Sequence, residues 1–95
     1  MSDHTAKSLA QADLLLPLLQ ALPAGAERDE LIETAEALRR AIAAFHMEAI
    51  RFRMYSVDRL LHEVNGATEA RAAFDQLRKD LEDAGFHTRS HSAPV

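Results

Sequence analysis

The composition is informative first for what it lacks. The 95-residue chain has no cysteine and no tryptophan, and only five of its residues are aromatic. Without cysteine it can form no disulfide, no thiolate nucleophile and no Cys-ligated zinc site. β-Branched residues are also scarce, whereas the helix formers Ala, Leu, Glu and Arg are common. We therefore expect an all-α protein whose core consists mainly of leucine and alanine side chains.

Charge and hydropathy argue against two further classes of protein, those that bind nucleic acid broadly and those that span a membrane. The formal net charge is −4, whereas broad nucleic-acid binding requires an excess of Lys and Arg along one face. The longest apolar run, LLLPLLQAL at residues 14–22, contains Pro17 and is far shorter than the roughly 20 residues that cross a bilayer. No signal-peptide cleavage pattern follows it. These features predict a cytoplasmic protein with no membrane span and no nucleic-acid partner.

Proline and glycine clusters divide the chain into three segments without strand-like alternation. The clusters are PAGAERDE (23–30), NGAT (65–68) and DAGFHTRSHSAPV (83–95). The first predicted helix covers about residues 8–22, where Pro17 either kinks or divides it. The second covers about 26–64, which at 1.5 Å per residue gives a rod of about 58 Å. The third covers about 68–84.

The end of the third helix carries a stop signal. Gly85 is placed to adopt the left-handed conformation of a Schellman ending, and Phe86 is the apolar residue expected to fold back onto the helix. Residues after Phe86 are polar. We therefore predict one helical domain over residues 1–86 and a flexible polar tail over residues 87–95.

The long central helix has apolar residues on two faces. The first face, here called the N-terminal stripe, comprises Leu31, Ala35, Leu38, Ile42, Phe45, Ala49 and Phe52. The second, the C-terminal stripe, comprises Met47, Ile50, Met54, Val57, Leu61 and Val64. The two stripes overlap over residues 45–54. A helix with one face exposed to solvent needs only a single apolar stripe.

A second copy of the chain is the simplest cover for both stripes, because two short helices cannot cover a 58 Å rod. The fold prediction is thus a three-helix chain with a helical hairpin, assembled as a dimeric helical bundle. The alternative is a helix broken near residue 46 or 65 in a monomeric bundle of three or four helices. The predicted interface residues are Leu38, Ile42, Phe45, His46, Met47, Ile50, Phe52, Arg53, Met54 and Val57.

Four polar side chains of the long helix are candidates for chemistry. His46 and Arg53 lie seven residues apart between the two stripes, where they form either a polar pair at the interface or a site for an anionic ligand. Asp58 and His62 are four residues apart, a spacing at which two ligands reach one metal ion. With His46 they are the weak metal candidates, and the alternative is an ordinary surface pair.

The sequence contains no nucleophile elbow and no glycine-rich phosphate loop. It predicts no catalytic residues and no cofactor, and it favours a non-enzymatic role over an enzymatic one. We expect a helical protein–protein interaction module, a small homo-oligomeric adaptor, regulator or accessory subunit, that associates with itself and can dock on another protein. The alternative function is a helical bundle that binds a metal ion or a small anionic ligand through His, Asp and Arg side chains.

Overall fold

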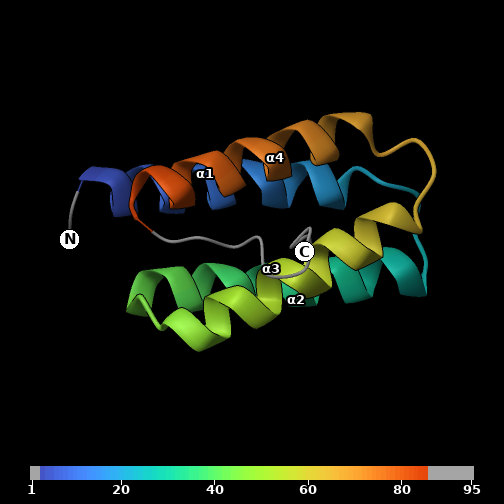
Figure 1. Cartoon of the computed structure of the whole chain (residues 1–95). Coiled ribbons are helices and arrows are strands. Elements are labelled where there is room, and N and C mark those ends of the chain that lie inside the picture. The colour runs from blue at the N-terminus through green and yellow to red at the C-terminus, as the bar shows by residue number, and fades with distance from the viewer. Residues whose placement is uncertain (1–2, 86–95) are drawn as a thin grey trace, which may run out of the picture.

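The computed structural model describes residues 3–85 and contains four antiparallel α-helices joined by short turns (Figure 1). The helices are α1 (Asp3–Gln20), α2 (Ala26–Ala44), α3 (Met47–His62) and α4 (Thr68–Asp83). The all-α class predicted from the composition is confirmed. The predicted count of three helices is wrong, because the segment 26–64 forms two helices and not one. The helix is broken near residue 46, as in the alternative prediction.

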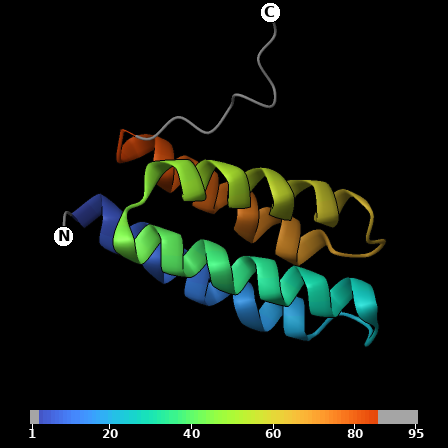
Figure 2. The same ribbon diagram turned by 90° about the horizontal axis from the view of Figure 1, so that it is seen from below.

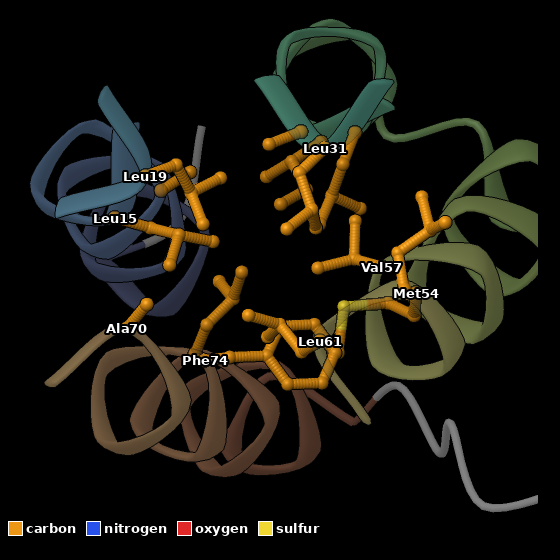
Figure 3. Packing of buried hydrophobic residues seen from close by; sticks show 14 of the residues in the cluster. Leu15, Leu19, Leu31, Met54, Val57, Leu61, Ala70 and Phe74 are labelled. Atoms are coloured by element: carbon orange, nitrogen blue, oxygen red, sulfur yellow. The ribbon is translucent and has the colours of Figure 1, made fainter. Parts of the chain in front are cut away.

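The four helices form a bundle in which each packs beside its neighbours along the chain and α4 returns to α1 (Figure 2). α1 therefore lies diagonally opposite α3, and α2 lies opposite α4 (Figure 3). The backbones of α3 and α4 make the fewest close approaches among the neighbouring pairs. Long side chains must fill that wider interface, and the polar ones among them form the candidate site described below.

The break between α2 and α3 is a Schellman motif that contains no glycine. Phe45 takes the left-handed conformation at φ 50°, and its N–H donates to the Ile42 carbonyl at 2.9 Å. The next N–H, of His46, donates to the Ala41 carbonyl at 3.0 Å. These two bonds satisfy carbonyls that the end of α2 would leave unpaired. The predicted continuous helix ends here because the backbone reverses its direction at residues 45 and 46.

The break explains why the apolar residues fall on two faces when residues 26–64 are treated as one continuous helix. Most of the N-terminal stripe belongs to α2 and most of the C-terminal stripe belongs to α3. The reversal turns the buried members of both stripes toward the same interior. Leu31, Leu38 and Ile42 of α2 are fully buried, as are Ile50 and Val57 of α3. Figure 3 shows Leu31 and Val57 within this core. The rest of the core consists mainly of leucines and alanines from all four helices, together with Met54 and with Phe74, which has 0% of its surface exposed. One chain thus covers most of both stripes by itself.

α1 continues through Pro17 as one helix, beginning earlier than predicted from the sequence. Proline has no N–H to donate to the carbonyl of Asp13, four residues earlier, and both residues are exposed. The Asp13 side chain accepts a hydrogen bond from Arg39 of α2, which raises the pKa of Arg39. At the other end, Arg28 donates to the Gln20 carbonyl at 3.3 Å and so caps α1.

The end of α4 follows the predicted stop. Gly85 has φ 92°, and its N–H donates to the Glu82 carbonyl at 2.9 Å. The predicted contact of Phe86 and the predicted tail at 87–95 lie outside the described residues. Within residues 3–85, no helix combines the length and the hydropathy that a bilayer span requires.

Candidate functional site

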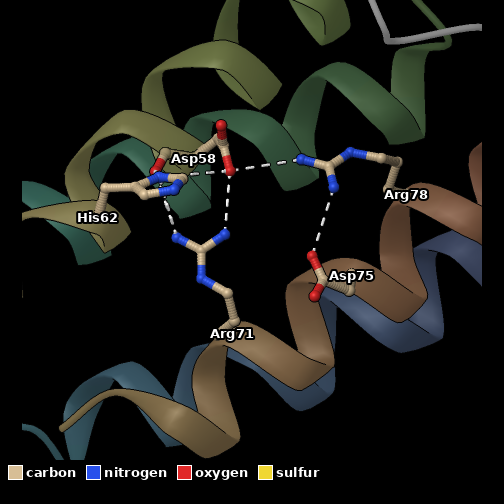
Figure 4. Close-up of polar contacts among 5 residues, drawn as sticks. All are labelled: Asp58, His62, Arg71, Asp75 and Arg78. Atoms are coloured by element: carbon tan, nitrogen blue, oxygen red, sulfur yellow. Dashed lines mark hydrogen bonds and ion pairs between the residues drawn. The ribbon is translucent and has the colours of Figure 1, made fainter. Parts of the chain in front are cut away.

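The densest group of charged side chains lies between α3 and α4 and is centred on Asp58 (Figure 4). Only 16% of the Asp58 side chain is exposed. Its Oδ1 accepts hydrogen bonds from Arg71 Nη1 at 3.1 Å and from Arg78 Nη2 at 3.4 Å. Both arginines belong to α4, so this single carboxylate of α3 connects the two neighbouring helices whose backbones make the fewest close approaches.

His62 forms the exposed edge of this cluster. Its Nδ1 lies 2.9 Å from the carbonyl oxygen of Asp58, one helical turn earlier, and 3.3 Å from Arg71 Nη2. A carbonyl only accepts and a guanidinium only donates, so Nδ1 can serve one of these partners at a time. The Nδ1 to Asp58 Oδ1 distance is 3.8 Å. His62 therefore lies against the Asp58–Arg71 pair at its solvent side and adds a weaker contact.

Arg78 is held on three sides. Besides Asp58, its Nη1 bonds Asp75 at 3.3 Å, and its guanidinium lies over the Phe74 ring at 5.0 Å from the centroid. Its buried Nε has no hydrogen-bond partner. Two carboxylates, Asp58 and Asp75, thus face two guanidinium groups, and the cluster is close to neutral when His62 is neutral. This balance makes the cluster an electrostatic connection between helices.

Of the three predicted metal ligands, Asp58 and His62 lie 3.8 Å apart, whereas His46 lies elsewhere. No group of three or more His, Cys, Asp or Glu side chains in the described part of the chain is arranged to hold a metal ion. Asp58 directs its oxygen at two arginines, which compete with a cation for it. His46 lies at the other end of α3, 12 residues and about 18 Å from Asp58 along the helix.

His46 and Arg53 have separate local roles. His46 is the N-cap of α3, and its Nδ1 accepts the Ala49 N–H at 3.2 Å, which satisfies one of the free donors at the helix start. Arg53 lies over the Phe52 ring at 5.1 Å, a cation–π contact on the surface. The structure thus gives His46 a capping role that the pattern of apolar residues did not indicate.

The ten predicted interface residues fall into two groups. Five are buried in the core of the chain itself: Leu38, Ile42, Ile50, Met54 and Val57. Phe45, Met47 and Phe52 remain 41%, 43% and 59% exposed. His46 is also exposed, and Arg53 is half-buried. Tyr55, which belongs to neither apolar stripe, is 49% exposed.

Sequence reasoning missed the α4 half of the polar cluster. Arg71 and Arg78 are seven residues apart, a spacing that places both on one edge of α4 beside its buried face. That spacing was the available signal, but it indicates an ion-pair site only once α3 is known to lie beside α4. No family model, curated protein or solved structure matches this chain significantly.

Proposed function

We propose that the chain is a non-enzymatic helical protein–protein interaction module that docks through the outer side of α3 and the turn before it. The supporting observation is where large apolar side chains are exposed. Five such side chains are exposed in the described part of the chain, and four of them lie within residues 45–55: Phe45, Met47, Phe52 and Tyr55. The fifth, Leu14, lies alone on α1.

Two properties of this group support docking. Single exposed apolar residues are common on protein surfaces, but aromatic and methionine side chains are enriched at contact surfaces, and four of them are exposed here within 11 residues. They also lie on a helix and at a hydrogen-bonded turn, so little conformational entropy is lost on binding. In this proposal the chain works in the cytoplasm, where an absence of cysteine suits reducing conditions.

The alternative, binding of a metal ion or a small anion at Asp58 and His62, has less support. The two arginines that could hold an anion already bind Asp58. An anionic ligand would have to displace that carboxylate from both guanidinium groups, leaving Asp58 buried without its counter-charges.

Site-specific photo-crosslinking tests the proposed surface. A benzoylphenylalanine residue replaces Phe52 in one variant and the exposed Ala72 of α4 in a control, and each variant is expressed in cells of the organism that encodes the chain. We expect discrete adducts from position 52 and none of these from position 72. Adding Tyr55→Asp should remove the adducts at position 52. The same adducts from both positions, or no adducts at position 52, would contradict the proposal.

A further inference from the structure

The outward face of α3 carries a regular row of four exposed residues. This row, here called the outer stripe, consists of Glu48, Phe52, Tyr55 and Arg59. Successive members are four, three and four residues apart, which places them along one line of the helix. The opposite face of α3 carries Ile50, Met54, Val57 and Leu61, all buried in the bundle. The outer stripe therefore points away from the core.

The outer stripe is complementary to a second copy of itself that runs in the opposite direction. It begins with an acid, ends with a base and has two aromatic rings between them. We propose that a second copy of this chain docks on the outer stripe, with the two α3 helices antiparallel about a two-fold axis between residues 53 and 54. Glu48 then faces Arg59 of the other copy, and Phe52 faces Tyr55 of the other copy. This inference rests on the proposed function and names its partner.

The charges select the antiparallel arrangement. A parallel pairing would place Glu48 against Glu48 and Arg59 against Arg59, and juxtaposed like charges disfavour association. Within one chain, Arg59 Nη1 lies 3.7 Å from Glu63 Oε2, and both side chains are about half exposed. A guanidinium has five N–H donors, so Arg59 can keep Glu63 and also bind Glu48 of the other copy.

The spacing and the aromatic centre suit a helix–helix contact. A four–three–four spacing is that of the apolar positions along which two helices pack in a coiled coil. Aromatic rings prefer offset or edge-to-face contact, and each two-fold pairing makes two such Phe52–Tyr55 contacts. Arg53, already over the Phe52 ring at 5.1 Å, lies at the side of the stripe and would shield the ring pair from water.

The contact is small, so the dimer must be weak. One row of four side chains on a 16-residue helix corresponds to the low end of protein interfaces, below about 1,200 Å² in total. We therefore expect a reversible dimer with a dissociation constant of about 10 to 1,000 μM. The chain would be monomeric when dilute and dimeric where it is concentrated, for example on a shared scaffold.

A charge-reversal cycle tests the arrangement by sedimentation equilibrium from about 10 μM to about 1 mM. Glu48→Arg alone and Arg59→Glu alone should each raise the dissociation constant by at least about tenfold, because each creates two like-charge contacts. Glu48→Arg/Arg59→Glu together should restore it to within about threefold of the original value. The two positions are about 16.5 Å apart within one helix, beyond the screening length, so only contact between copies explains restoration.

A matched control distinguishes an effect on dimerisation from an effect on folding. Glu69→Arg/Lys79→Glu reverses an exposed acid and an exposed base on α4 and should leave the dissociation constant unchanged. Circular dichroism melts identify any loss of helix stability, which reversing an acid in the first turn can cause. Phe52→Ala should weaken the dimer by about tenfold or more while the melt shows a folded chain.

The outcomes separate this inference from the proposed function. A wild-type chain that stays monomeric at 1 mM, single variants that bind as tightly as wild type, or a double variant that is not restored would each overturn the antiparallel dimer. If position 52 then still crosslinks to a different protein, the interaction module stands and only its partner is wrong. If position 52 gives no adduct of any kind, both proposals fail.

Discussion

Asp58 offers the sharpest test of whether the polar cluster stabilises the bundle. The change is Asp58→Ala, which removes the carboxylate that accepts bonds from Arg71 at 3.1 Å and Arg78 at 3.4 Å. Hydrogen bonds to charged groups contribute about 1.5 to 3 kcal/mol each when buried. The arginine side chains are 31% and 24% exposed, and water screens part of that value. We therefore expect a loss of about 2 kcal/mol in the free energy of unfolding.

The expected loss is large relative to the total stability of such a chain. A protein of this size has an unfolding free energy of about 5 to 14 kcal/mol, and each kcal/mol lost lowers the melting temperature by about 4 to 8 °C. Asp58→Ala should thus lower the melting temperature by about 8 to 16 °C. Asp58→Asn, which keeps an acceptor oxygen but not the charge, should cost about half as much.

Urea unfolding monitored by circular dichroism is the appropriate assay, because the guanidinium salt would screen the charges under test. The control is Glu63→Ala, which breaks the exposed Arg59–Glu63 pair and should cost about 0 to 0.5 kcal/mol. A loss for Asp58→Ala no greater than that of the control would refute the stabilising role. That result would instead favour the alternative function, in which the two arginines bind a ligand.

Substitutions at three further positions test local features of the bundle by their melting temperatures. Pro17→Ala should stabilise the chain by about 1 to 3 kcal/mol, because it restores the missing N–H in the exposed part of α1; a lower melting temperature would show that α1 needs the proline. His46→Ala should cost about 0.5 to 2 kcal/mol through loss of the Ala49 cap. His46→Asp, which keeps a capping oxygen, should recover most of it, and equal losses from both would exclude capping as the cause. Phe74→Ala should cost about 3 to 5 kcal/mol, because this ring has 0% of its surface exposed; a loss below 1 kcal/mol would place Phe74 outside the core.

The sequence predicts the helical class and most helix boundaries, because local signals determine them. Acidic residues in the first turn indicate the start of α2 near Ala26, and the Asn65–Gly66 turn indicates the start of α4 at Thr68. Gly85 ends α4 with a positive φ, as predicted. Each of these features depends on the chemistry of only a few neighbouring residues.

The break at residues 45 and 46 could not be found from those local signals. Its left-handed position is occupied by Phe45 and not by glycine or asparagine, and its N-cap is His46 and not Ser, Thr, Asp or Asn. The one available signal was the change in direction of the apolar stripes near residue 45, which indicates a break as well as a second partner. The polar cluster was missed for a related reason, since Arg71 and Arg78 meet Asp58 only after α4 packs beside α3.

The distance between the start of α2 and the end of α3 tests most directly whether one chain buries its own core. Glu30→Cys/Glu63→Cys carries the only two thiols in a chain without cysteine, and spin labels on them report that distance by pulsed electron resonance. Unlabelled protein in excess removes signals between copies. An antiparallel pair of helices with axes about 10 Å apart predicts labels within about 25 Å. A continuous helix over residues 26–64 would place them about 50 Å apart, and that result would contradict the bundle and return the buried residues of α2 and α3 to an interface between chains.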